Sequence, residues 1–522
     1  MPDTLRPARV DPVPLATLAA LARAELRGPA AGSTAGILIC GVTHDSRRVQ
    51  PGDLFAALPG AHTHGARYVA DAVTAGAVAV LTDPAGASLI NREVPLLICA
   101  DPRKTLGPVA AAIYGHPARA LVTLGVTGTN GKTTTVFFLD AGLRAAGHRT
   151  GLLGTVMTRL GERTVPSART TPEAPDIQAL LARMRDDGIT AAAMEVSSHA
   201  LALHRVDGTG FACVGFTNLS HDHLDFHGDM ENYFAAKARL FRPDFAPKAV
   251  IVVDDEYGRR LADTAPIAVR TVSGRPEHLP PDRRPDWRVV AVRAAAAVSP
   301  TRPAGQVATV AGPIGEVELS LQLPGRFNLT NALLALAILV EVGIPVEAAR
   351  AGIGDLAGVP GRLELVDAGQ PFAVLVDYAH TPEAVATVAR EVRPDRGRLI
   401  IVIGCGGDRD PSKRPAMGAA AAELADLAIF TSDNPRSEDP EEIVAAMLTG
   451  VPAVTADRRA EIRVELDRHE AIKDAIQAAR PGDVVLIAGK GHEQGQEIGG
   501  VVHPFDDRLA ARDALRSCGW AA

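Results

Sequence analysis

Residues 121–147 read LVTLGVTGTNGKTTTVFFLDAGLRAAG, and this stretch predicts a strand, a glycine-rich turn and a helix in succession. The apolar run over 121–126 is typical of a buried strand, and the helical pattern begins beside Lys132. Glycines in the turn allow backbone N–H groups to approach a phosphate closely. The sequence therefore predicts a nucleotide-binding α/β domain built around this turn.

The same stretch carries the residue types that phosphate binding requires. A helix N-terminus favours anions, Lys132 can neutralise the β- and γ-phosphate oxygens, and the Thr133 hydroxyl can ligate Mg²⁺. The pattern is a shorter variant of G-x-x-x-x-G-K-T, because Val126 stands where that pattern has glycine. A plain glycine-rich turn is the alternative, and the flanking strand and helix disfavour it.

Composition narrows the class of protein. A chain of 522 residues suggests about three domains, at roughly 100–200 residues each. Lys+Arg 54 against Asp+Glu 61 gives a net charge of −7, which argues against a protein that coats nucleic acid. With 47% hydrophobic and 22% charged residues, disorder throughout the chain is excluded.

Targeting signals and cysteine frameworks are not evident in the sequence. No apolar run approaches the roughly 20 residues of a membrane span, and the N-terminus does not resemble a signal peptide. We therefore expect a cytoplasmic protein. The five cysteines are odd in number and scattered, which predicts neither a disulfide framework nor a zinc site.

Short apolar runs alternate with amphipathic stretches along the whole chain, which favours α/β architecture. We place domain boundaries near residue 117 and at GVPGRLE (358–364). The first region has expected strands at 36–44 and 77–82. The second has expected strands at 191–196, 211–218 and 249–254, a loop-rich insertion at 273–306, and a helix at 328–342. The third has four expected strands, within FAVLVDY, RLIIVIG, LAIFTSD and DVVLIAG, which suggests a small doubly wound sheet.

Three further stretches carry candidate chemistry. Glu195 ends the strand AAAMEV and could ligate Mg²⁺ beside a phosphate, although a helix cap is the alternative. Residues 218–228 read NLSHDHLDFHG, a set that suits Mg²⁺ or Mn²⁺ better than zinc, although some of its Asp residues would simply cap a helix. Lys237 lies fourteen residues beyond His223 in a helical pattern, and alone it indicates only a surface or ion-paired lysine.

Together these motifs resemble the Mur ligase family of peptidoglycan synthesis. The resemblance rests on GTNGKTTT, MEVSSH, NLSHDHLDFHG and YFAAKARLF, on DSR and PGDLF upstream, and on GRFN, DYAHTP, GCGGDRD, DNPR and GKGHE downstream. It implies a three-domain architecture: a UDP-MurNAc-binding domain at 1–117, a central P-loop ATPase domain at 118–357, and a Rossmann-like amino-acid-binding domain at 358–522. It also implies a role in cell wall formation, and through it in cell shape and division.

The resemblance further implies an ATP-dependent ligase that adds meso-diaminopimelate to UDP-N-acetylmuramoyl-L-Ala-D-Glu through an acyl phosphate. ATP and Mg²⁺ are the implied cofactors, and Lys237 is implied to carry a CO₂-derived carbamate, which converts an ammonium into an oxygen ligand. The implied catalytic residues are Lys132, Glu195, His223 and Lys237, and the implied metal ligands are Thr133, Glu195, His223 and carbamylated Lys237. The implied ATP-binding residues are Gly128, Thr129, Asn130, Gly131, Lys132, Thr133, Thr134, Asn331 and Asp377, of which Asn331 and Asp377 could equally be caps. The implied UDP-substrate residues are Ser46, Thr170, Thr171, Ser197 and Arg205.

The sequence is most informative about which amine the enzyme uses as its substrate. Diaminopimelate differs from lysine by a second carboxylate, so rejecting lysine requires a partner for that anion. Arg436 follows the strand LAIFTSD and suits bidentate carboxylate capture, although a surface ion pair with Glu438 or Asp439 is the alternative. The implied amine-binding residues are Arg409, Asp433, Asn434, Pro435, Arg436, Gly489 and Glu493.

Several alternatives stay open at this stage. A lysine-adding Mur ligase is one, since some members with this arginine accept lysine, and the role of His221 is undefined because the family often has Arg or Gln there. Folylpolyglutamate synthase shares the turn and the lysine, but the DSR, PGDLF and DNPR motifs oppose it. A nucleic-acid-dependent P-loop ATPase is opposed by the net charge of −7 and by only two Trp and five Tyr. The intact set of catalytic residues opposes an inactive scaffold. We expect neither a nucleic-acid partner nor a membrane span.

Overall fold

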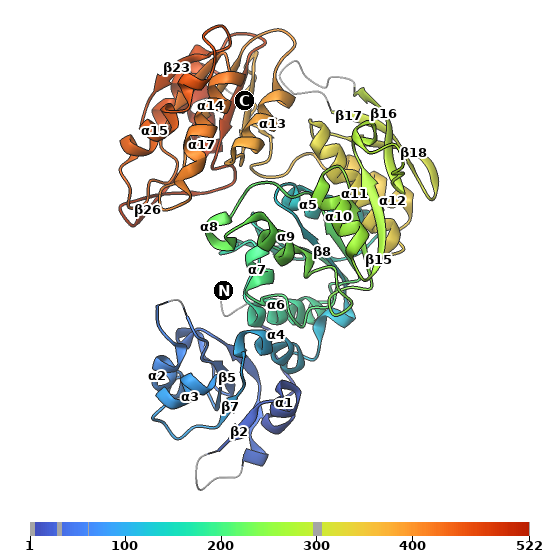
Figure 1. Ribbon diagram of the computed structural model, residues 1–522, viewed down its shortest axis with the longest axis vertical. Helices are drawn as coiled ribbons and strands as arrows, with labels where there is room; N and C mark the ends of the chain where they lie inside the picture. The colour runs from blue at the N-terminus through green and yellow to red at the C-terminus, as the bar shows by residue number, and fades with distance from the viewer. Residues whose placement is uncertain (1–5, 29–33, 61, 296–304, 521–522) are drawn as a thin grey trace.

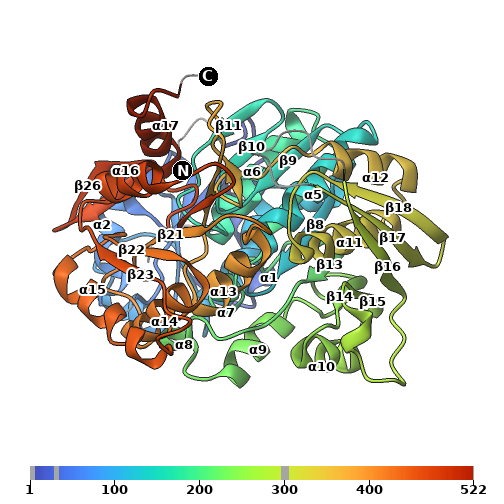
Figure 2. The same cartoon turned by 90° about the horizontal axis from the view of Figure 1, so that it is seen from above.

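The computed structural model describes residues 6–28, 34–60, 62–295 and 305–520. The chain forms three α/β bodies stacked along its long axis, in sequence order from the blue end to the red end of Figure 1. Seen from above, the C-terminal body lies in front of the N-terminal one, and the central body extends to one side (Figure 2). The predicted three-domain α/β architecture is confirmed, and we continue to propose the boundaries at 117/118 and 357/358. In the described residues, no helix is both long enough and apolar enough to cross a membrane.

The N-terminal body contains a five-stranded sheet in which four neighbouring strands are parallel. Its spatial order is β2 (Glu25–Arg27), β7 (Leu96–Ile98), β6 (Ala79–Thr82), β5 (Asp53–Ala56) and β4 (Gly41–Thr43). Its helices are α1 (Leu15–Ala22), α2 (Val69–Thr74), α3 (Pro84–Leu89) and α4 (Pro102–Ile113). The single strand expected at 36–44 is wrong. Leu38–Ile39 (β3) pairs instead with Val13–Pro14 (β1), so the chain changes sheets at Cys40.

The central body is built on an eleven-stranded sheet. Its order is β11 (Arg163–Val165), β10 (Thr158–Leu160), β9 (Thr150–Leu153), β12 (Ala191–Glu195), β8 (Val122–Thr127), β13 (Cys213–Phe216), β14 (Lys248–Val252), β15 (Ala268–Ser273), β16 (Trp287–Ala294), β17 (Gln306–Gly312) and β18 (Gly315–Leu321). Strands β9 to β16 of that order are parallel, and the remaining pairs are antiparallel. Strand β8 lies between parallel neighbours, so the turn after it opens at the edge where β12 and β13 also end.

Helices cover both faces of this sheet. They are α5 (Lys132–Ala145), α6 (Ala174–Asp186), α7 (Ser198–Ala202), α8 (Leu224–His227), α9 (Met230–Ala238), α10 (Glu256–Thr264), α11 (Arg326–Glu341) and α12 (Val346–Asp355). Apolar residues of α5, α11 and α12 pack on one face, and those of α6, α7, α9 and α10 on the other. Helix α6 also packs against α4, which joins the first two bodies.

The loop-rich insertion expected at 273–306 is partly wrong, because residues 287–294 form strand β16. Trp287 is 1% exposed and Val289 is 4% exposed, whereas the rest of the strand faces solvent. A solvent-facing strand can be rich in Arg and Ala, so composition alone concealed it. Residues 296–304 of this expected insertion lie outside the described residues.

The C-terminal body is a doubly wound sheet, as predicted. Its order is β19 (Glu364–Leu365), β20 (Ala373–Asp377), β24 (Val484–Ala488), β21 (Leu399–Ile403), β22 (Leu427–Phe430) and β23 (Glu461–Val464). Helices α13 (Pro382–Val392), α14 (Arg414–Leu424) and α15 (Pro440–Leu448) cover one face, and α16 (Arg468–Ala478) and α17 (Asp507–Ser517) the other. A hairpin of β25 (Gly495–Ile498) and β26 (Val501–Pro504) projects from this body. The strands β20, β21, β22 and β24 are parallel, so the loops that follow them share one edge.

Candidate active site

The turn between β8 and α5 can be made only with glycine at two positions. Gly128 has φ +149° and Gly131 has φ +86°, and Gly131 caps α5. A Cβ at Gly128 would lie 1.8 Å from Thr217 Oγ1, and one at Gly131 would lie 2.4 Å from Asn331 Oδ1. The turn therefore keeps its backbone N–H groups open at the N-terminus of a helix, which is the arrangement that binds phosphate.

Lys132 folds back over this turn. Its Nζ donates hydrogen bonds to the carbonyl oxygens of Gly128 (2.9 Å) and Thr129 (2.8 Å). Burial lowers the pKa of Lys132, while the nearby Glu195 carboxylate opposes that shift. Among the described residues, the ammonium is thus held by neutral carbonyls, which an anionic phosphate would outcompete.

The strand register brings Glu195 to the same place. Strand β12 runs parallel to β8 with Glu195 opposite Val126, and the side chain is 1% exposed. Thr133 Oγ1 donates to Glu195 Oε2 at 3.0 Å, so the two predicted metal ligands are in contact. Thr155, just beyond β9, donates to both carboxylate oxygens, through its N–H at 2.7 Å and its hydroxyl at 3.0 Å. Sequence reasoning missed Thr155, which no motif marks and which reaches Glu195 only through the sheet.

Lys237 is fully enclosed beneath the turn. It is 1% exposed, and its Nζ donates to the Gly128 carbonyl at 2.7 Å and lies 4.7 Å from the centre of the Tyr233 ring. Burial, reinforced by the charge of Lys132, lowers the pKa of Lys237 well below its ordinary value. The two lysines therefore share one carbonyl oxygen, an arrangement that favours a neutral amine at Lys237.

The fourth predicted metal ligand is placed differently. His223 has φ +54° at the start of α8, and its Nε2 lies 3.4 Å from Asp222 Oδ2. Its ring packs edge-on against His199 at 4.8 Å, and burial lowers its pKa to about 4. Among the described residues, His223 makes no direct contact with the other three predicted ligands. In the same part of the chain, no cluster of three or more His, Cys, Asp or Glu side chains forms a preassembled metal site. Two buried oxygens and a neutral imidazole still fit Mg²⁺ chemistry.

A cavity of about 410 Å³ opens beside the turn and lies between the central and C-terminal bodies. Its walls include the predicted nucleotide residues Asn130, Gly131, Thr134, Asn331 and Asp377. Burial raises the pKa of Asp377, whose two carboxylate oxygens accept backbone N–H bonds from Leu363 and Ala379, each at 2.8 Å. The carboxylate therefore also shapes the wall of the cavity that it lines.

Arg362 joins the two bodies at this cavity. Its Nη2 donates to Thr133 Oγ1 at 3.1 Å, and its guanidinium lies 4.7 Å from the centre of the Tyr378 ring. The side chain therefore reaches from the segment 358–364 back to the glycine-rich turn. Sequence reasoning used GVPGRLE as a boundary and as part of the family resemblance but gave Arg362 no role, and the single arginine within it was the available signal.

The predicted UDP-substrate residues fall into two groups. Thr171 Oγ1 donates to Glu195 O (2.8 Å) and accepts from Ser197 N (3.0 Å), and the Oγ1 atoms of Thr155 and Thr170 lie 3.0 Å apart. Arg205 Nη1 donates to the Thr171 carbonyl at 3.4 Å, and its Nε lies 2.9 Å from Glu173 Oε1. These four therefore cluster at the end of β12. Ser46 lies apart from them in the N-terminal body, in the same short 3₁₀ helix as Arg48, whose Nη2 pairs with Asp176 of α6 at 3.0 Å.

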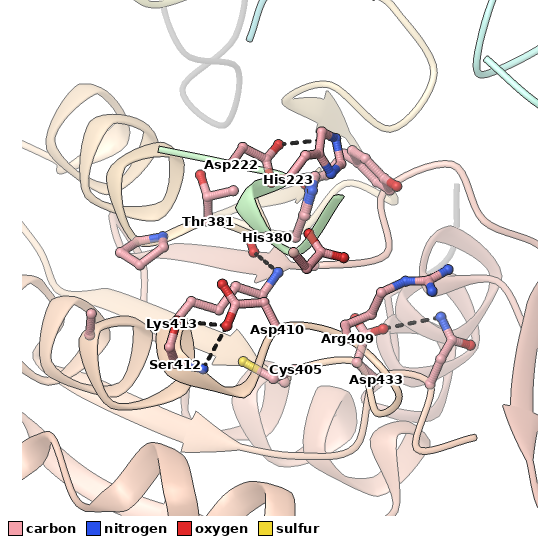
Figure 3. Close-up of a pocket in the computed structure, with 18 of the residues that line it drawn as sticks. Asp222, His223, His380, Thr381, Cys405, Arg409, Asp410, Ser412, Lys413 and Asp433 are labelled. Atoms are coloured by element: carbon pink, nitrogen blue, oxygen red, sulfur yellow. Dashed lines mark hydrogen bonds and ion pairs between the residues drawn. The ribbon is translucent and has the colours of Figure 1, made fainter. Parts of the chain in front are cut away.

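A second cavity, of about 650 Å³, contains most of the predicted amine-binding residues. Arg409, Asp433, Asn434, Arg436, Gly489 and Glu493 line it, whereas Pro435 does not. Asp222 and His223 lie across the cavity from Arg409 and Asp433 (Figure 3). The loops that follow three parallel strands thus meet opposite the side chains of the central body, as expected for the carboxyl edge of an open sheet.

Arg436 is held by its backbone as well as by its side chain. It has φ +54°, its N–H donates to the Glu497 carbonyl at 2.9 Å, and its own carbonyl accepts from Gly499 N at 2.7 Å. Nη1 donates to the Gly407 carbonyl at 2.6 Å, and Nε lies 3.2 Å from Glu497 Oε2. The ion pair expected as the alternative, with Glu438 or Asp439, is not formed, because Glu438 pairs with Arg414 at 2.8 Å and Asp439 caps α15.

Comparison with known proteins follows the same three bodies. Residues 38–114 match the Mur ligase family catalytic domain, 126–339 the Mur ligase middle domain, and 361–491 the Mur ligase glutamate ligase domain. A protein of Streptomyces avermitilis named UDP-N-acetylmuramoyl-L-alanyl-D-glutamate–2,6-diaminopimelate ligase is 50% identical over 99% of both chains. A protein of Leifsonia xyli named UDP-N-acetylmuramyl-tripeptide synthetase is 43% identical, also over 99% of both.

Solved structures give the same result. One titled as a UDP-N-acetylmuramoyl-L-alanyl-D-glutamate–2,6-diaminopimelate ligase is 31% identical, with a TM-score of 0.65 over 94% of this chain and 97% of that one. The folylpolyglutamate synthase of Mycobacterium tuberculosis is 21% identical, with a TM-score of 0.58 over 80% and 95%, and so shares only the fold. The chain belongs to the Mur ligase family.

Proposed function

We propose that this chain is an ATP-dependent ligase that joins meso-diaminopimelate to UDP-N-acetylmuramoyl-L-Ala-D-Glu in peptidoglycan precursor synthesis. The observation that carries the proposal is the cavity that Arg436 and Glu493 line together with Asp222 and His223 of the central body. The relatives named for a 2,6-diaminopimelate ligase support it at 50% identity. Because the reaction consumes ATP, we place it in the cytoplasm, with neither nucleic acid nor a membrane as partner.

The chemistry needs ATP because a carboxylate is a poor electrophile. The γ-carboxylate of D-glutamate attacks the γ-phosphorus of ATP, which releases ADP and forms an acyl phosphate. The neutral amine of diaminopimelate then attacks the acyl carbon, and the tetrahedral oxyanion collapses to an amide and inorganic phosphate. In our proposal Lys132 exchanges its carbonyl partners for the β- and γ-phosphate oxygens and so offsets the repulsion between two anions.

Mg²⁺ fits the donor set beside the turn. We propose that Thr133 and Glu195 hold it, that Thr155 fixes the Glu195 carboxylate, and that bound Mg²⁺ supplies positive charge at the phosphates. A second Mg²⁺ would use Glu195, His223 and a carbamate on Lys237. Carbamylation requires a neutral amine: the Nζ lone pair adds to CO₂ and one proton leaves. The burial of Lys237 beside Lys132 favours that neutral form.

The remaining predicted residues are assigned by position. The ATP-binding set 128–134 with Asn331 and Asp377 would hold the nucleotide in the 410 Å³ cavity, where Arg362 also reaches the phosphates. Thr170, Thr171, Ser197 and Arg205 would bind the dipeptide end of the UDP substrate. Ser46 would bind the UDP end in the N-terminal body, so the three substrates approach from three bodies.

An amine panel tests this function. The enzyme is supplied with ATP, Mg²⁺ and UDP-N-acetylmuramoyl-L-Ala-D-Glu, and ADP release and the mass of the product are measured with meso-diaminopimelate, L-lysine, D-glutamate or D-Ala-D-Ala. We expect product only, or at least 100-fold faster, with meso-diaminopimelate. Faster turnover with L-lysine would assign the lysine-adding reaction instead. Turnover with a folate and glutamate, and none with the UDP substrate, would remove the proposal altogether.

A further inference from the structure

Lys490 is a fully buried lysine beneath the second cavity. Its exposed fraction is 0%, and it follows Gly489 directly after β24. Its Nζ donates to Asn434 Oδ1 at 3.1 Å, to Glu493 Oε2 at 3.1 Å and to the Gly495 carbonyl at 2.7 Å. An ammonium has three hydrogens, so each of them is used within the protein. Lys490 is also not among the residues that line the cavity.

These contacts fix how two cavity residues are oriented. With its oxygen turned to Lys490, the Asn434 amide directs Nδ2 to Glu493 Oε2 (2.8 Å) and to Asp433 Oδ1 (3.1 Å). Glu493 Oε2 therefore accepts two hydrogen bonds, and Oε1 accepts none among the described contacts. The carboxylate is thus clamped by one oxygen, and the other is left for a ligand.

The same ammonium links the loop after β22 to the hairpin. Glu497 N donates to Asn434 Oδ1 at 3.0 Å, and Gln496 Nε2 donates to the Asp433 carbonyl at 2.8 Å. Lys490 binds both sides of this junction, through Asn434 on one side and Gly495 on the other. The backbone of Arg436 is held by the same hairpin, at the Glu497 carbonyl. Lys490 therefore adds a charged contact to the bonds that join the two loops of the amine cavity.

We propose that Lys490 is a positioning residue for the amine substrate: it clamps Asn434 and Glu493 so that Glu493 Oε1 receives the distal ammonium of diaminopimelate. The inference rests on the proposed function. A lysine suits this task because the Asp433 and Glu493 carboxylates both accept from the Asn434 amide, and an ammonium beside them offsets their repulsion. Lys490 does not touch the substrate. It acts through the two side chains that it holds.

The first test compares Lys490→Met with Lys473→Met, which removes a half-exposed lysine of α16 paired with Glu470 at 2.7 Å. We expect Lys490→Met to raise KM for meso-diaminopimelate about 10-fold or more, as expected for an unclamped charged partner. KM for ATP and for the UDP substrate should change less than about 2-fold, and Lys473→Met should match the wild type. Positional isotope exchange in ATP, measured with the UDP substrate and no amine, should persist, because phosphoryl transfer does not use this corner. Equal increases in the KM values for the amine, ATP and the UDP substrate, or an unchanged KM for the amine, would overturn the inference.

A second comparison separates positioning from general support of the fold. If Lys490 acts through Glu493, the double variant Lys490→Met/Glu493→Gln should match Glu493→Gln in KM for diaminopimelate to within about 3-fold. The double variant removes the ammonium together with the Glu493 carboxylate that accepts from it, so this comparison holds even if Lys490→Met alone does not fold. A double variant far worse than Glu493→Gln would show that Lys490 acts elsewhere and would overturn the inference. Failure of the wild type to use diaminopimelate at all would instead remove the proposed function.

Discussion

Replacing Arg436 by alanine tests the amine assignment most directly. The side chain is 21% exposed, and it makes an ion pair with Glu497 at 3.2 Å and a hydrogen bond to the Gly407 carbonyl at 2.6 Å. The backbone bonds to Glu497 and Gly499 do not depend on the side chain. Alanine should therefore keep the loop in place and leave a cavity wall without its cation.

The expected costs differ between folding and catalysis. A half-exposed ion pair and one hydrogen bond contribute about 1–2 kcal/mol together, so Arg436→Ala should unfold only slightly more easily. Losing the partner of the distal carboxylate should cost about 2–4 kcal/mol in kcat/KM for meso-diaminopimelate, or roughly 30- to 1000-fold. Activity with L-lysine, which lacks that carboxylate, should change less than about 3-fold.

The assay is initial-rate ADP release with each amine, at saturating ATP and UDP substrate. Arg463→Ala serves as the control, because it removes an exposed ion pair with Glu461 in the same body. Thermal melting of each variant shows that both remain folded. If Arg436→Ala turns over diaminopimelate like the wild type, or loses lysine activity equally, Arg436 does not read the second carboxylate and the substrate assignment is wrong.

Three other predictions concern the central body and its junction. Lys237→Ala should nearly abolish ligation, and added formate or acetate should partly restore it by supplying the missing oxygens; ATP turnover as in the wild type would exclude the carbamate role. Arg362→Ala should raise KM for ATP about 10- to 100-fold while KM for the amine is unchanged, because its guanidinium meets Thr133 rather than the amine cavity. Burial, reinforced by the positive charges of Arg362 and Arg508, lowers the pKa of His492 from 6.5 to about 3. Between those pH values the unfolded chain binds a proton that the folded chain does not, so the free energy of unfolding decreases as the pH is lowered. When the pH is lowered from 7.5 to 5, the free energy of unfolding measured by denaturant titration should therefore decrease by up to about 2 kcal/mol less in His492→Gln than in the wild type. An equal decrease in both proteins would contradict this prediction.

The local part of the site was predictable because it is encoded by neighbouring residues. Gly128 and Gly131 adopt positive φ values and contact other side chains too closely for any larger residue. Helix α5 begins at Lys132, within one residue of the start at Thr133 that the sequence predicts. The same locality explains why the third region was recognised as doubly wound, since each of its buried strands is a short apolar run.

Contacts made across the sheets were not predictable in this way. Thr155 meets Glu195 because β9 and β12 are parallel neighbours, and neither residue's surroundings in sequence indicate the other. Strand β16 was concealed because only Trp287 and Val289 of its eight residues are buried. Arg362 reaches Thr133 across 229 positions of the chain. In each case the pairing depends on strand register or on how two bodies meet, which one sequence does not contain.

Two buried lysines show that the contacts of a side chain, and not its residue type alone, indicate its role. Lys237 and Lys490 both lie on or beside regular elements, and nothing in either sequence context separates a reactive amine from a permanent cation. Lys237 forms no ion pair with a carboxylate in the described part of the chain, and its ammonium shares the Gly128 carbonyl with Lys132. Lys490 has the Glu493 carboxylate and two neutral oxygens as acceptors. Because charge without a counter-ion is costly in a buried site, Lys237 favours the neutral form that our proposed reaction with CO₂ requires. Lys490, in contrast, is paired with a carboxylate and holds its neighbours. The roles that we propose for the two lysines thus follow from their partners.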